Sequence, residues 1–200
     1  MAQVADTLAP EESFNVIALP EVWVFAKDPS FASDEERKAY ELLKRRVKYV
    51  YPYAKKAAEK LQEVEKVLDT LPSIRKKKRY TKAVQKDTEK RFSAELKKLS
   101  RSQGRILIKL IHRQTGKTAF ALVKELRSGW RAFWYNNTAW LYDLSLKTPY
   151  DPYQNREDFL IEDVLQRAFS EGSLEEQAPA QPIDYGALLQ KWNLTPKTKH

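Results

Sequence analysis

Apolar residues follow a seven-residue repeat near the start of the chain. Between residues 40 and 71 they alternate at spacings of three and four: Tyr40, Leu43, Val47, Val50, Ala54, Ala57, Leu61, Val64, Leu68 and Leu71. Such spacing is the seam of an amphipathic helix of the coiled-coil kind. Ser33 and Glu36 form a capping-box motif at its start. The pattern therefore predicts a helix over residues 34–70, kinked at Pro52 because proline cannot donate the helical hydrogen bond.

A second and weaker apolar stripe follows over residues 74–99. Its members are Ile74, Tyr80, Val84, Phe92, Leu96 and Leu99. Pro72 separates it from the first helix, and Ser73 can cap it. Two helices joined by so short a connection predict an antiparallel hairpin over residues 34–100. The first seam can be buried within this hairpin or between two chains; the nearby second stripe favours the hairpin and a monomer.

Residues 102–171 predict a compact helical body. We expect helices over residues 105–114, 117–127 and 130–142. A further helix, capped by Asn155, has an apolar face made by Phe159, Leu160, Val164, Leu165, Ala168 and Phe169. The tail over residues 172–200 begins as a linker, and residues 183–192 form a short amphipathic segment within it.

The N-terminal part differs from this helical pattern. Residues 1–13 are small, polar and acidic, which predicts a disordered leader. Residues 14–26 are β-branched and aromatic and predict an extended arm or a small hairpin. The expected fold is mainly α: a long antiparallel helical hairpin plus a compact helical body, with a short N-terminal β-like arm, in one domain over residues 14–171.

Composition excludes several classes of protein. The chain has no cysteine, which excludes disulfide scaffolds, thiol catalysis and zinc fingers. Its two histidines, His112 and His200, are too few for a histidine-built metal site. No apolar run reaches the length of about 18 residues that a membrane span requires. We expect no cofactor, no metal ion and no integral membrane span.

Charge is concentrated in the predicted hairpin. The whole chain carries +9, and residues 34–101 hold 22 Lys and Arg against 11 Asp and Glu, a net charge of +11. Both ends of the chain are acidic, so the basic middle favours an anionic partner. The densest run, Arg75, Lys76, Lys77, Lys78 and Arg79, lies at the expected hairpin tip. Such a run binds the phosphates of nucleic acid or lipid headgroups, or serves only as a solvated helix face.

An unusual aromatic segment supplies a second candidate surface. Residues 130–142 contain six aromatic side chains, which either pack as a central helix or line a groove that stacks on a ligand. The candidate groove residues are Lys109, His112, Arg113, Arg127, Arg131, Trp134, Tyr135 and Asn136. Candidate partner-docking residues are Trp23, Tyr185, Leu188, Leu189 and Trp192, because a short amphipathic helix on a linker is a common helix-in-groove ligand.

Signals for enzymatic chemistry are weak. The fragment Thr115–Thr118 resembles the end of a phosphate-binding loop, but Ile111 stands where that loop needs its first glycine. Asp158 and Glu162 share a helix face. This pattern is typical of a site for a divalent ion or for acid–base catalysis. It is also typical of acidic residues near a helix start, where the helix dipole favours negative charge. His112 has no evident carboxylate to orient it as a general base. We assign no catalytic residue and favour a non-enzymatic protein.

Several ordered motifs resemble one family. They are LPEV (residues 19–22), VYPYAK (50–55), QGRILIKLIHRQTGKT (103–118) and ELRSGWRAFWYNNTAWLYDLSLKTPYDP (125–152). Together they are similar to an uncharacterised bacterial family, domain of unknown function 4294 (DUF4294), over roughly residues 14–170. Ser128 departs from the glycine pair expected before the aromatic segment. The resemblance implies an envelope protein, since many members begin with a signal peptide, and it implies no activity.

These observations lead to one functional hypothesis and two alternatives. We expect a non-enzymatic interaction or scaffold protein of the bacterial cell envelope, with a protein partner and with anionic lipid or nucleic acid as the other candidates. The alternatives are a cytosolic nucleic-acid-binding protein that uses the basic hairpin, and a carbohydrate-binding or enzymatic module that uses the Arg/Trp/Asn groove. Residues 1–13 lack the basic and apolar regions of a signal peptide. The envelope assignment therefore assumes a removed signal peptide, and a native start at Met1 would indicate the cytoplasm.

Overall fold

The computed structural model describes residues 29, 31–125 and 146–192. The leader, the N-terminal arm and the aromatic segment fall outside the described residues. The helices within them are α1 (Asp34–Thr70), α2 (Ile74–Leu96), α3 (Arg101–Thr115), α4 (Ala119–Glu125), α6 (Arg156–Ser170) and α7 (Tyr185–Lys191). These parts of the chain contain no strand, and the predicted mainly helical fold is confirmed.

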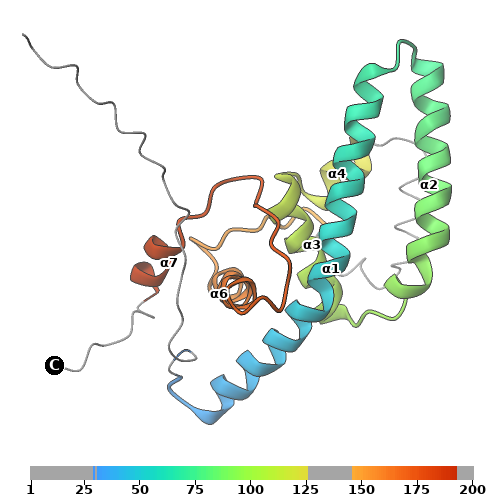
Figure 1. Ribbon diagram of the computed structural model, residues 1–200. Helices are drawn as coiled ribbons and strands as arrows, with labels where there is room; N and C mark the ends of the chain where they lie inside the picture. The colour runs from blue at the N-terminus through green and yellow to red at the C-terminus, as the bar shows by residue number, and fades with distance from the viewer. Residues whose placement is uncertain (1–28, 30, 126–145, 193–200) are drawn as a thin grey trace, which may run out of the picture.

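Helix α1 is the central element and has the predicted bounds. Ser33 caps it, since the Ser33 side chain accepts a hydrogen bond from the Glu36 backbone N–H at 3.2 Å. All ten seam positions from Tyr40 to Leu71 are buried or half-buried. Pro52 lies inside the helix, and Figure 1 shows the helix axis changing direction between its blue and teal parts. This bend agrees with the kink expected from a proline within a helix.

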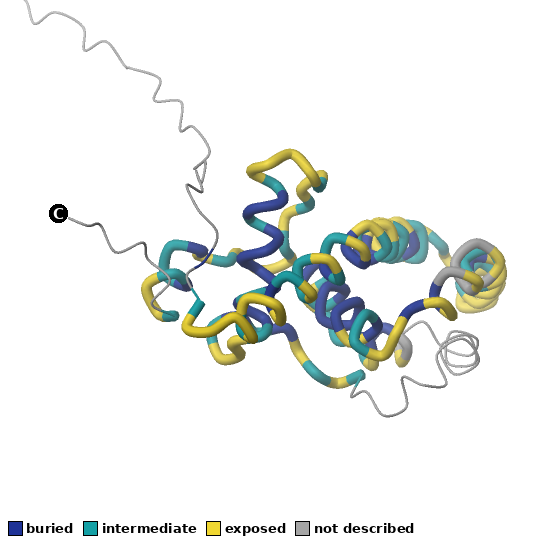
Figure 2. The backbone as a smooth tube through the Cα atoms, turned by 90° about the horizontal axis from the view of Figure 1, so that it is seen from below, coloured by how far each residue is buried: buried dark blue, intermediate teal, exposed yellow. Residues whose placement is uncertain are grey.

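Helices α1 and α2 form the predicted antiparallel hairpin (Figure 1). The Ser73 side chain accepts a hydrogen bond from the Lys76 backbone N–H at 3.3 Å and so caps α2. Val64 and Val84 are buried in the shared apolar core. Most other described positions of α2 are half-buried or exposed, as Figure 2 shows. The second arm of the hairpin therefore buries far less apolar surface than the first.

Helices α3 and α6 complete the core against α1. Helix α3 begins at Arg101, four residues earlier than predicted, because Ser100 and Gln103 form a reciprocal capping box. The sequence pattern predicted a start at residue 105, but Gly104 is buried inside the helix. The expected apolar positions of α3 are buried: Ile106, Leu107, Leu110 and Ile111. Helix α6 is capped as predicted, by the Asn155 side chain.

The segment after α6 lies against the helical body. It has no helix before α7, yet the Ala180 N–H donates to the Arg113 carbonyl at 2.8 Å. The Gln177 N–H donates to the Tyr51 hydroxyl at 3.0 Å. This segment, expected to be a linker, thus joins α3 to α1. Among the described helices, none is both long enough and apolar enough to cross a bilayer.

Candidate functional site

Two basic residues of α3, Lys109 and Arg113, point into the protein. Each is 3% exposed, although the sequence interpretation made them candidate residues of a ligand-binding groove. Arg113 forms a bidentate pair with Glu162 of α6, with Nε–Oε2 and Nη2–Oε1 distances of 2.7 and 2.8 Å. One helical turn away, Lys109 pairs with Asp158 at 2.5 Å. Two basic residues spaced by four thus meet two acidic residues spaced by four.

The hydrogen-bonding groups of Arg113 are occupied by its own chain. Its remaining nitrogen, Nη1, donates to the Gln114 side chain at 2.8 Å and to the Gln177 carbonyl at 3.3 Å. On the other side, the Tyr150 hydroxyl donates to Glu162 at 2.7 Å. The guanidinium and its carboxylate are therefore enclosed by protein groups. This geometry is that of a structural cluster that locks α3, α6 and the segment after α6 together.

The two buried carboxyl groups differ in their pKa. Burial raises the pKa of Glu162, but the charge and hydrogen bonds of Arg113 outweigh burial and leave it below the usual value. Burial also raises the pKa of Asp158, and here the opposing effects of the Asp151 N–H and of Lys109 are too weak to reverse it. Glu162 is thus held ionised, whereas Asp158 is the more easily protonated of the two.

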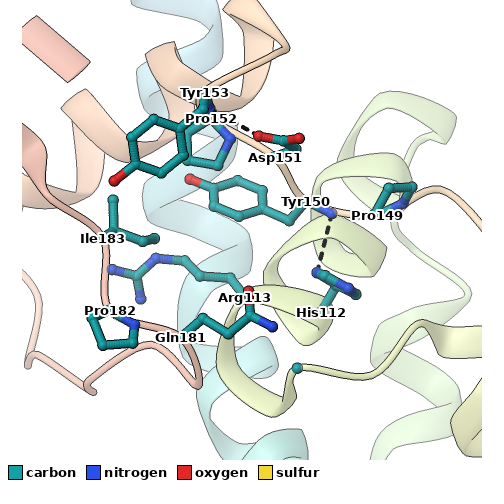
Figure 3. Close-up of a pocket in the computed structure, with 11 residues that line it drawn as sticks. His112, Arg113, Pro149, Tyr150, Asp151, Pro152, Tyr153, Gln181, Pro182 and Ile183 are labelled. Carbon is teal, nitrogen blue, oxygen red and sulfur yellow. Dashed lines mark hydrogen bonds between the residues drawn. The ribbon is translucent and has the colours of Figure 1, made fainter. Parts of the chain in front are cut away.

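His112 lies at the edge of a pocket of about 310 Å³ (Figure 3). Its Nδ1 accepts a hydrogen bond from the Tyr150 N–H at 3.1 Å, which leaves the proton on Nε2. Burial lowers the pKa of His112, and the nearby charge of Asp158 opposes this shift only in part. Asp151, also in the pocket, accepts bonds from the Tyr153 and Gln154 N–H groups. Both side chains therefore serve to hold the loop that precedes α6, over residues 146–155.

Asp163 joins three helices at a second buried cluster. It accepts hydrogen bonds from the Tyr40 hydroxyl at 2.5 Å, the Tyr185 hydroxyl at 2.6 Å and Arg167 Nε at 3.0 Å. Burial and the charge of Asp163 raise the pKa of Tyr185. Since Tyr40 lies on α1 and Tyr185 on α7, this carboxylate fixes the tail segment to the body.

The predicted docking residues of the tail contact their own chain. Leu188 is fully buried, Tyr185 is 3% exposed and Leu189 is half-buried. The Trp192 ring stacks on Phe159 of α6 with centroids 5.7 Å apart, and its Nε1 donates to the Pro152 carbonyl at 3.0 Å. Trp23 lies outside the described residues. The partner of this amphipathic segment in the structure is α6.

The basic run lies at the hairpin tip, as predicted. Arg75, Lys76, Lys78 and Arg79 are exposed and Lys77 is half-buried. None of these five side chains forms a hydrogen bond or ion pair with any residue that the structure describes. The first turn of α2 contains no acidic residue. These cations thus differ from Lys109 and Arg113, which have buried carboxylate partners.

The structure describes only part of the candidate groove. Arg127, Arg131, Trp134, Tyr135 and Asn136 fall outside the described residues, so only Lys109, His112 and Arg113 of that set have positions. Within the described parts of the chain, no three His, Asp or Glu side chains are grouped to hold a metal ion.

The buried ion pairs were not deduced from the sequence, although a signal for them exists. Lys109 and Arg113 are spaced by four residues, as are Asp158 and Glu162. Equal spacing of opposite charges on two helices lets both pairs form at once if the helices lie alongside each other. The sequence pattern of Asp158 and Glu162 was instead interpreted as a metal or acid–base site, or as favourable charges at the start of a helix.

The fold and these clusters define an α-helical protein with a closed, ion-paired body and an exposed basic hairpin. The family model named Domain of unknown function (DUF4294) matches residues 12–167, so the chain belongs to this family. No curated protein and no solved structure matches the chain.

Proposed function

We propose that this chain is a non-enzymatic interaction protein of the bacterial cell envelope that docks an anionic partner through its basic hairpin. The observation that carries the proposal is the cluster of five cations at residues 75–79, without a partner among the described residues. Cations inside the body are paired, as Arg113 is with Glu162. The unpaired cluster is therefore the part of the described surface best suited to an anionic partner.

The position of the cluster makes it costly for the isolated protein. The N-terminus of a helix carries a partial positive charge, so a cation there is unfavourable by about 0.3–1 kcal/mol. Like charges four residues apart, such as Arg75 and Arg79, repel each other in addition. An anionic partner would relieve both penalties. The charge pattern is thus more easily explained by binding than by folding.

Support for the envelope comes from the family rather than from the geometry. The resemblance described above implies envelope proteins that begin with a signal peptide. The candidate aromatic groove contributes little support, since Lys109 and Arg113 are committed to buried ion pairs. The proposal therefore depends on the hairpin.

The test is chemical cross-linking of the protein expressed from its native locus, after fractionation and sequencing of its N-terminus. A tip variant carries glutamine at Arg75, Lys76, Lys77, Lys78 and Arg79. A control variant carries glutamine at five exposed and scattered cations: Lys38, Arg45, Lys56, Lys124 and Lys191. Both variants lose the same charge. We expect recovery in the envelope fraction and loss of the cross-linked partner in the tip variant alone.

Two results would contradict the proposal. Equal loss in both variants would show that total charge, and not the tip, is responsible. Recovery in the cytoplasm with bound nucleic acid, and with affinity that falls steeply between about 50 and 200 mM salt, would favour the nucleic-acid alternative.

A further inference from the structure

The hairpin tip combines its cations with an exposed apolar side chain. Ile74, the first residue of α2, is 85% exposed, far more than the other exposed large hydrophobic residues in the described part of the chain, which are Leu42, Tyr49 and Phe120. Pro72 beside it is exposed and Leu71 is half-buried. Residues 66–79 hold six Lys and Arg against one Asp. The tip is therefore both apolar at its end and strongly positive behind it.

The shape of the hairpin leaves this tip accessible to a flat surface. Figure 1 shows the turn between α1 and α2 at the extreme end of the hairpin, away from α6 and α7. Residues 75–79 cover more than one helical turn, so their side chains surround the axis of α2. At a rise of about 1.5 Å per residue, their backbone lies about 1.5–7.5 Å behind Ile74 along that axis. The long Lys and Arg side chains extend the reach of these charges.

The distance along α2 between Ile74 and the cations at residues 75–79 matches the layers of a bilayer surface. An apolar side chain inserted by about 5–10 Å reaches the boundary of the acyl chains, and cations just behind it lie level with the lipid phosphates. Nucleic acid offers phosphates but gives Ile74 no apolar environment. An anionic bilayer offers both. We propose that the hairpin tip, residues 71–79, binds the surface of an anionic lipid bilayer, with Ile74 inserted between the headgroups and the five cations on lipid phosphates.

The inference rests on the proposed function, because it names the anionic partner of the hairpin. It is tested by sedimentation of the full chain with vesicles of phosphatidylcholine alone, or of phosphatidylcholine mixed with phosphatidylglycerol. We expect binding to the mixed vesicles only. Each cation near an anionic surface strengthens binding about fivefold. The glutamine tip variant should therefore bind the mixed vesicles more than a hundredfold more weakly than the wild type. The scattered control variant should bind them much better than the tip variant.

The inserted side chain is tested separately. Ile74→Ser should weaken binding to the mixed vesicles about tenfold, since it removes the apolar burial. Phe120→Ser, which also removes an exposed apolar side chain, should leave binding unchanged. Because the chain has no cysteine, Ile74→Cys can carry a polarity-sensitive dye at a single site. Its emission should shift to the blue on mixed vesicles, while the same dye at Leu42→Cys should not shift.

Other outcomes would overturn the inference. Equal binding to both kinds of vesicle, or unchanged binding by Ile74→Ser, excludes the proposed insertion. Binding to a soluble polyanion such as heparin, lost in the tip variant and without binding to mixed vesicles, would leave the proposed function intact but remove the bilayer as partner. Absence of binding to vesicles and of any tip-dependent cross-link would contradict both proposals.

Discussion

At the scale of single residues, the stability of the body depends on charges that have been removed from water. Arg113 and Glu162 have side chains with no exposed surface. Desolvation of such ions costs several kcal/mol each, and only their mutual attraction and hydrogen bonds offset it. Either ion alone would remain buried without a counter-charge. The two residues therefore function as a unit.

The first prediction concerns the removal of one charge of this pair. Glu162→Gln should destabilise the protein by about 3–5 kcal/mol, because it leaves the Arg113 guanidinium buried without a counter-charge. Thermal unfolding should show this as a fall in Tm of about 2–4 °C per kcal/mol for a chain of this size. The control is Glu157→Gln, since that carboxylate is 36% exposed and pairs with exposed Arg105 as well as with Lys109. A comparable fall in Tm in both variants would show that Arg113 and Glu162 do not act as a unit.

The second prediction is the pH dependence of the same pair. The folded pKa of Glu162 lies below its ordinary value of 4.5, so the unfolded chain takes up a proton first as the pH falls. The stabilisation by Glu162 is therefore fully present above about pH 4.5 and is lost as the pH falls through the folded pKa. Asp158 has the opposite effect on stability. Its folded pKa is raised, so protonation, which removes its buried charge, stabilises the folded protein as the pH falls.

Urea unfolding over a range of pH measures this effect. The difference in unfolding free energy between the wild type and Glu162→Gln should shrink as the pH falls from about 4.5 to the folded pKa of Glu162, and it should level off below that pKa. A difference that stays constant across that range would show that Glu162 is not ionised in the folded protein.

At the scale of elements, the two arms of the hairpin differ in how they are held. Between Val47 and Ala58, α1 packs five fully buried or nearly buried residues into the core, whereas Val84 and Leu96 are the described α2 residues that do so. Elements with little apolar burial open more readily. We expect backbone amides of α2 to exchange with deuterium faster than those of residues 47–58. Equal protection in both segments would show that α2 is held by contacts beyond those described.

The tail helix gives a prediction at the same scale. Leu188 is fully buried against Phe159 and Tyr185, so Leu188→Ala should destabilise the protein by about 2–5 kcal/mol. Leu189→Ala, at a half-buried position, should cost less. Thermal unfolding of both variants measures the difference. A negligible effect of Leu188→Ala would mean that α7 detaches easily and is free to dock elsewhere.

The elements with strong local signals were predictable from sequence, and those set by distant contacts were not. The seam of α1, the caps at Ser33 and Asn155, and the break at Pro72 depend on neighbouring residues, and the structure confirms them. The start of α3 was missed although the Ser100–Gln103 pair is local. The burial of Lys109 and Arg113 could not follow from α3 alone, because it depends on α6 lying beside it. The docking of α7 depends in the same way on Asp163.

At the scale of the whole molecule, cations are used in two different ways. Some cations of the body, including Arg113 and Arg167, are buried beside carboxylates and hold helices together. Those at the hairpin tip, apart from half-buried Lys77, are exposed at one end of α2, where few of the described residues are buried. This division separates a stable body from a projecting arm. It is the arrangement expected of a protein that reaches a charged surface without unfolding its core.

The last prediction is that the isolated protein is a monomer. The seam of α1, from Tyr40 to Leu71, could have paired two chains, but its buried residues contact the core formed by this chain itself. The large apolar residues of α1 that remain exposed are Leu42 and Tyr49, at 40% and 48%. Sedimentation equilibrium should give the mass of one chain, 23.4 kDa, at every protein concentration. A dimer that forms with rising concentration and is abolished by Leu42→Ser with Tyr49→Ser would prove this wrong and place the contact on the outer side of α1.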